Sequence, residues 1–74
     1  MQNNEYWIFT FGCGQLNSGK YVKVYGSYEE ARRKMFAKYG NMWAFQYSAE
    51  KWRSWIIRAG QVGMPVETEL EVIE

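Results

Sequence analysis

Histidine is missing from this chain of 74 residues, and cysteine and proline occur only once each. Without histidine the chain can form neither a Cys–His catalytic pair nor a histidine-ligated metal site, and it lacks the usual general base at neutral pH. The one thiol, on Cys13, lies between two glycines and has no neighbour that would favour its thiolate. We therefore expect no enzymatic activity, no metal and no cofactor.

Two further absences concern where the protein works. A single cysteine cannot form an intramolecular disulfide, whereas a secreted domain of this size usually carries several. No apolar run approaches the roughly 20 residues of a membrane-spanning helix, and the first residues lack the basic and apolar regions of a signal peptide. The sequence thus predicts a cytoplasmic protein that does not bind membranes.

Aromatic residues are abundant instead. Four Trp, six Tyr and four Phe make up 19% of the chain, and the net charge is +1. A packed ring removes on the order of 150–250 Å² from water, so a few rings can support a core that would otherwise be marginal at this length. We expect one folded domain over residues 1–74.

The first half of the chain changes from strand to helix periodicity. Residues 6–11 and 20–25 are rich in β-branched and aromatic side chains, which predicts two strands joined by a glycine-rich loop. Ser27 and Glu30 then match a capping box, and an apolar stripe at helical spacing follows. Gly40 is a typical helix terminator. A helix between Ser27 and Gly40 is the best-supported element.

The second half repeats this alternation. Residues 42–47 return to period two, with their aromatic side chains on one face. Ser48 can cap a helix over residues 48–59, which Gly60 is expected to stop. Residues 66–73 alternate between apolar and acidic side chains, which is typical of a strand with one face in water.

These elements predict the α+β class in the order β-β-α-β-α-β. We expect a small, mainly antiparallel sheet with two helices on one face, and the order of strands in the sheet stays open. Glu67, Glu69 and Glu71 should point outward from the last strand, where they discourage edge-to-edge aggregation or face Lys20 and Lys23 across the sheet.

The run from Gly14 to Lys20 matches the spacing G-x-x-x-x-G-K of a phosphate-binding loop. Such a loop needs Ser or Thr next and then a helix, whereas Tyr21 follows here and begins a predicted strand. We interpret the match as a hairpin loop. A minor alternative is a small-molecule site in which residues 12–19 line an aromatic pocket.

The surplus of rings predicts a protein-binding patch, since this core cannot hide them all and Trp, Tyr and Arg dominate binding hot spots. The candidates come from the predicted second helix and the strand before it: Trp52, Trp55, Arg53, Arg58 and Trp43. The plainer interpretation is loose packing at the rim of a small domain.

The alternative is a nucleic-acid surface in which tyrosines stack on bases and cations meet phosphates. Its candidates lie on the second strand and the first helix: Tyr21, Lys23, Tyr25, Arg32 and Arg33. The plainer interpretation is that the tyrosines pack under a helix while the charges keep the helices soluble.

Five strings carry a resemblance to known proteins: residues 7–14, 19–26, 30–40, 43–48 and 67–70. With them the chain resembles small uncharacterised proteins encoded by phages and mobile elements of Gram-positive bacteria. The resemblance implies an accessory protein acting inside an infected bacterial cell. Such proteins often inhibit host defence, anti-CRISPR proteins among them. It brings no site residues.

The sequence therefore leads to two hypotheses. The first is a non-catalytic, protein-binding accessory factor that inhibits a bacterial defence complex. The second is a nucleic-acid-binding module. The identity of a protein partner and the formation of a homodimer stay open.

Overall fold

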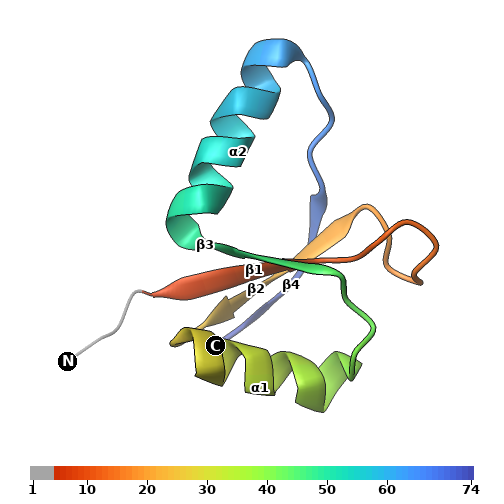
Figure 1. Cartoon of the computed structure of the whole chain (residues 1–74), viewed down its shortest axis with the longest axis vertical. Coiled ribbons are helices and arrows are strands. Elements are labelled where there is room, and N and C mark those ends of the chain that lie inside the picture. The colour runs from red at the N-terminus through yellow and green to blue at the C-terminus, as the bar shows by residue number, and fades with distance from the viewer. Residues whose placement is uncertain (1–4) are drawn as a thin grey trace.

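Two consecutive strands are followed by alternating helices and strands in the computed structural model, which describes residues 5–74. The elements are β1 (Tyr6–Thr10), β2 (Lys20–Tyr25), α1 (Tyr28–Tyr39), β3 (Phe45–Ser48), α2 (Ala49–Val62) and β4 (Thr68–Ile73). This is the predicted β-β-α-β-α-β order of an α+β domain. Figure 1 shows how the sheet and the helices are arranged.

The strands form a single sheet in the order β3-β1-β2-β4. β1 is antiparallel to both β2 and β3, whereas β4 runs parallel to β2. The prediction of a mainly antiparallel sheet is confirmed, with the C-terminal strand as the parallel exception. β3 and β4 form the two edges, while β1 is paired on both sides.

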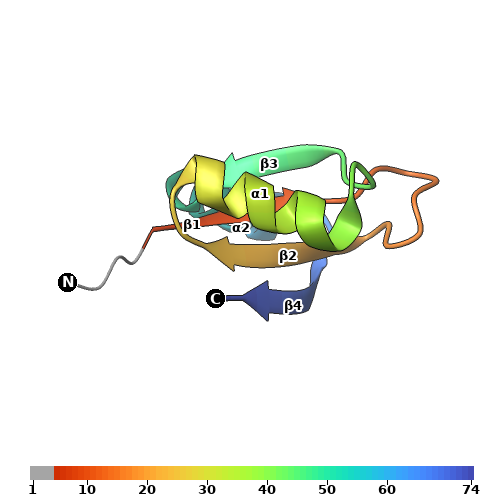
Figure 2. The ribbon, with the colours of Figure 1, turned by 90° about the horizontal axis from the view of Figure 1, so that it is seen from below.

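The helices cover opposite faces of the sheet, which corrects the expectation that both lie on one face (Figures 1 and 2). The reason lies in β1, where side chains are buried on both faces. Phe9 belongs to the core cluster with Ala31 and Met35 of α1. Ile8 and Thr10 point the other way and are also buried. A central strand that is apolar on both faces needs a helix on each.

Helix α1 has the predicted ends. The Ser27 hydroxyl accepts a hydrogen bond from the backbone N–H of Glu30, and the Glu30 carboxylate accepts one from the N–H of Ser27. Gly40 closes the helix with φ of 62° and donates its N–H to the carbonyl of Phe36. The helix is therefore specified by local chemistry at both termini.

Helix α2 is longer than predicted. Ser48 caps it as expected and accepts a hydrogen bond from the N–H of Lys51. Gly60, however, lies inside the helix, which continues to Val62 and ends at Gly63 in the left-handed conformation (φ 72°). A glycine costs an exposed helix only about 1 kcal/mol, so it does not by itself stop one.

β3 begins at Phe45 rather than at residue 42. Trp43 precedes the strand and packs on the α1 face against Phe9, whereas Tyr47 faces α2 and contacts Trp52. The expected alignment of Trp43 with Phe45 and Tyr47 was therefore wrong.

β4 contains an irregularity that turns one glutamate inward. Tyr21 is paired with Glu69 but the next residue, Val22, is paired with Glu71, so Leu70 is an extra residue in the register. A bulge of this kind breaks the alternation of side chains. Leu70 and Ile73 pack against the α1-side core, and Glu71 contacts α1. The prediction that all three strand glutamates point outward fails at Glu71.

Candidate binding surfaces

Two of the five candidates for a protein-binding patch serve packing: Trp52 is buried, and Trp43 is half-buried against the core. Trp52 is only 4% exposed, and its ring packs on Tyr21 at 4.9 Å and on Tyr47 at 5.7 Å between centroids. These contacts hold α2 to the sheet. Trp52 is therefore a packing residue and not an exposed anchor.

Trp43 is half-buried at the other face. Its ring lies 4.9 Å from that of Phe9 and 5.7 Å from that of Phe36, and its indole N–H donates to the carbonyl of Gly40. The ring covers the end of the α1 core. It lies on the face opposite to α2, so the structure does not unite it with the other four candidates.

The remaining candidates lie on the outer surface of α2. Arg53 lies one helical turn from Ile56 and Ile57 on one flank, and Trp55 lies one turn from Arg58 on the other. The buried pair Trp52 and Ala59 separates these flanks. We call the six residues that the flanks expose the α2 surface: Arg53, Trp55, Ile56, Ile57, Arg58 and Val62.

The α2 surface is unusually apolar for a solvent-facing helix. Ile56 is 40% exposed, Ile57 62% and Val62 63%, and Trp55 is partly exposed. Figure 1 shows α2 rising from the sheet, while α1 lies along it. A helix with apolar residues on more than its core-facing stripe is typically covered by something else. The candidates predicted from the sequence include Trp55 and both arginines but not Ile56, Ile57 or Val62.

The nucleic-acid candidates on β2 contact different residues. Lys23 places its ammonium 4.3 Å from the centroid of the Tyr6 ring and 5.0 Å from that of Tyr25. A hydrogen bond with the Tyr25 hydroxyl, outweighing partial burial, raises the pKa of Lys23. The group is therefore a cation held between two rings. Tyr6, which sequence analysis did not select, completes it.

Tyr21 lies on the same face of the sheet as Lys23, but it packs against α2. Trp52 covers its ring, and its hydroxyl donates to Glu69 at 3.5 Å. Burial and the Glu69 carboxylate raise the pKa of the Tyr21 phenol. Tyr21 is thus engaged in packing α2 and is not an open stacking platform.

Arg32 and Arg33 lie on α1, across the sheet from Lys23. Arg32 stacks on the exposed Phe36 ring, with the guanidinium carbon 5.3 Å from its centroid. The five nucleic-acid candidates therefore do not form one surface. Their separation weakens the two-element site that the sequence predicted.

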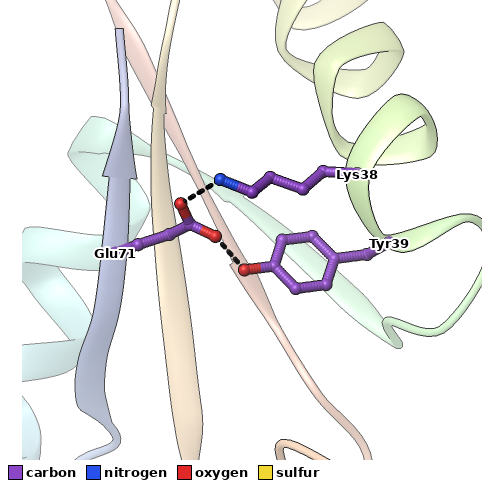
Figure 3. Close-up of polar contacts among 3 residues, drawn as sticks. All are labelled: Lys38, Tyr39 and Glu71. Atoms are coloured by element: carbon purple, nitrogen blue, oxygen red, sulfur yellow. Dashed lines mark hydrogen bonds and ion pairs between the residues drawn. The ribbon is translucent and has the colours of Figure 1, made fainter.

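A polar cluster joins α1 to the C-terminal strand (Figure 3). Lys38 donates to Glu71 at 2.5 Å, and the Tyr39 hydroxyl donates to the other oxygen of the same carboxylate. The Lys38 and Tyr39 hydrogen bonds hold the pKa of Glu71 below its usual value. Burial and the Glu71 carboxylate raise the pKa of Tyr39 to about 12. No sequence signal revealed this cluster, because it depends on the bulge in β4.

The loop between β1 and β2 does not have the structure of a phosphate-binding loop. Lys20 begins a strand rather than a helix, as the hairpin interpretation predicted. The loop is held locally, with the Gly12 N–H donating to the Gln15 side chain at 2.5 Å. Cys13 is exposed, and Leu16 is 90% exposed. The loop thus points its large apolar side chain at solvent, which does not favour the aromatic pocket considered above.

Over residues 5–74 no cluster of three or more acidic or cysteine side chains is arranged to hold a metal ion. In the same part of the chain no helix is long and apolar enough to cross a membrane. Comparison with known protein families, with curated proteins and with solved structures gave no match.

Proposed function

We propose that the protein is a non-catalytic binding factor that docks its helix α2 onto another protein. The observation that carries this proposal is the α2 surface, in which Ile56, Ile57 and Val62 are exposed beside Trp55, Arg53 and Arg58. Trp and Arg are the residues that most often dominate binding energy, and apolar neighbours exclude water around them.

Covering the exposed apolar side chains of α2 with a partner is energetically favourable. Complete burial of one Ile or Val side chain is worth about 1.5–3 kcal/mol relative to exposure. The sheet does not recover this for Ile57 or Val62, because Trp52 and Ala59 occupy the stripe that faces the interior. On one flank Ile57 lies one turn from Arg53, and on the other Val62 lies one turn from Arg58. An amphipathic helix laid into a groove buries residues at this spacing. The arginines on both flanks favour a groove with an acidic rim.

The setting comes from the resemblance to small phage and mobile-element proteins. In that setting the partner is a component of a bacterial defence complex, and a docked α2 inhibits it by covering a surface that it needs. Occlusion requires no catalytic group, which agrees with the absence of histidine from the chain.

A nucleic-acid-binding module is the second candidate, and one observation favours it. Tyr6, Lys23 and Tyr25 place a cation between two rings on the face of the sheet. This cluster is small, and the arginines of α1 do not extend it. Binding through it would weaken steeply with salt, because phosphate contacts release counterions.

A tagged pull-down from bacterial lysate tests the proposal, run with and without nuclease at low and high salt. We compare the wild-type chain with Ile57→Ser/Val62→Ser, which removes apolar side chains from α2 at little cost in helix propensity. Leu16→Ser is the matched control, since it removes an exposed apolar side chain from the β1–β2 loop.

We expect the wild type and Leu16→Ser to retain the same protein after nuclease treatment and at high salt. The α2 variant should bind this protein at least about tenfold more weakly, which corresponds to 1.4 kcal/mol. Equal retention by all three chains would show that α2 is not the docking element. Recovery of nucleic acid alone, lost at high salt, would favour the Tyr6–Lys23–Tyr25 cluster instead.

A further inference from the structure

The two edges of the sheet differ in charge. β4 and the residues around it carry Glu67, Glu69, Glu71 and Glu74, whereas residues 39–49, which include all of β3, carry no charged side chain. Charged residues on an edge strand prevent it from pairing with another strand. Two copies of β4 would repel each other, and two copies of β3 would not.

The β3 edge is also open and apolar. Among residues 5–74, β3 is paired with β1 alone, so in this part of the chain no strand lies beside the other side of its backbone. Phe45 is 60% exposed on the strand itself, and Met42, just before it, is 53% exposed. An edge with unpaired backbone groups and an exposed ring is a template for strand addition.

We propose that β3 is a self-association surface, at which a second copy of this chain adds its own β3 in antiparallel fashion. The two sheets then form one continuous sheet about a twofold axis. Such an isologous contact closes after two copies, whereas β3 joined to the acidic β4 edge would continue into a fibre.

The faces of the sheet limit the possible registers. An axis perpendicular to the sheet keeps α2 of both copies on the same face, so paired residues must also share a face. An axis centred on any residue of β3 satisfies this condition, and we choose Gln46 because that centre pairs Phe45 with Tyr47 of the second copy, twice. Both side chains lie on the α2 face, since Tyr47 contacts Trp52 and Phe45 is two residues away. Aromatic pairs directly opposite each other stabilise a sheet.

Light scattering coupled to size-exclusion chromatography tests this surface. The wild type should show the mass of two chains of 8.8 kDa, with dissociation only on dilution. Gln46→Lys places two like charges opposite each other at the axis, and Lys51, which lines the same hollow as Gln46, adds to the repulsion. We expect it to weaken the dimer by at least about tenfold, or 1.4 kcal/mol.

Two controls separate this surface from others. Thr68→Lys adds the same charge to the exposed β4 edge and should leave the dimer intact. Ile57→Ser/Val62→Ser should also leave it intact, so that dimerisation and partner docking fail independently. A monomeric wild type at every concentration overturns the proposal, as does an α2 variant that alone dissociates the dimer.

A cross-linking variant covers the case in which Gln46→Lys does not fold. In Cys13→Ser/Gln46→Cys the two new thiols face each other at the axis, so oxidised glutathione should convert them into a covalent dimer. Cys13→Ser/Thr68→Cys should stay monomeric under the same treatment. Absence of the covalent dimer in the first variant overturns the register, and the β3 surface with it.

Discussion

Tyr39 of α1 donates its hydroxyl to Glu71 of β4, a residue that lies on the far edge of the sheet. The same carboxylate accepts a hydrogen bond from Lys38 at 2.5 Å, so two consecutive helix residues hold the C-terminal strand (Figure 3). Within residues 5–74, β4 is paired only with β2, and this cluster links it to α1. The pH dependence of stability should therefore report on it.

In acid, the wild type should lose stability as Glu71 is protonated. The native pKa of Glu71 lies below its ordinary value of 4.5, so the stabilisation is complete above pH 4.5 and is lost as the pH falls through the native pKa. Because the pair is partly exposed, we expect it to be worth about 1 kcal/mol or less.

Urea denaturation between neutral pH and pH 3 measures this effect. Glu71→Gln should flatten the acid limb relative to the wild type, and Lys38→Met combined with it in a double-mutant cycle should show that the two changes are not additive. An acid limb unchanged in Glu71→Gln would show that other carboxylates control it.

In alkali, the wild type should lose stability as the pH rises and Tyr39 is deprotonated. The pKa of Tyr39 rises from 10.0 unfolded to about 12 folded, so the native state holds this proton more tightly. The contribution is complete below pH 10 and is lost as the pH rises towards 12. Tyr39→Phe should lower the free energy of unfolding by about 1 kcal/mol at neutral pH and reduce its fall between pH 10 and 12.

Lys38 is the other ionisable group beside Glu71, and Tyr39→Phe leaves it in place, so the difference from wild type isolates the phenol. Tyr28→Phe is the matched control, since the Tyr28 ring packs on Trp7 at the opposite end of α1. If both substitutions change the alkaline limb equally, the Tyr39–Glu71 hydrogen bond does not cause it.

The two tryptophans of α2 should behave differently on truncation. Trp52 is buried against Tyr21 and Tyr47, so Trp52→Ala should cost about 3–5 kcal/mol, which approaches the whole stability of a domain this small. Trp55 is partly exposed, and Trp55→Ala should cost less than about 1 kcal/mol.

Thermal melting followed by far-UV circular dichroism distinguishes these outcomes. Trp55→Ala should melt cooperatively near the wild-type temperature, whereas Trp52→Ala should be largely unfolded. Comparable losses in the two variants would mean that Trp55 is also a packing residue, and the α2 surface would then consist of its isoleucines, its valine and its arginines.

Much of the fold could be predicted because its signals are local. Ser27 with Glu30, and Ser48 with the N–H of Lys51, satisfy backbone groups within one turn, so their pattern can be recognised without knowledge of the rest of the chain. The C-terminal end of α2 was harder to predict, because Gly60 and Gly63 are both reasonable helix terminators. Only Gly63 adopts a positive φ.

The candidate sites were harder to predict because exposure is not a local property. The spacing of Trp52, Trp55 and Ile56 is consistent with a single buried stripe, yet only Trp52 is buried. Tyr21, Lys23 and Tyr25 share a face of β2 as predicted, yet Trp52 covers the first while Tyr6 meets the other two. Each outcome depends on an element far away in the sequence.

By itself the sequence determined the α+β class, the order of elements and most helix ends, because periodicity and capping act over a few residues. Only the tertiary structure decided that the helices lie on opposite faces, that the uncharged β3 lies at an edge, and that Glu71 turns towards α1. These features arise from burying both faces of β1 and from a bulge in β4. Both depend on contacts between residues distant in the chain, which no local pattern records.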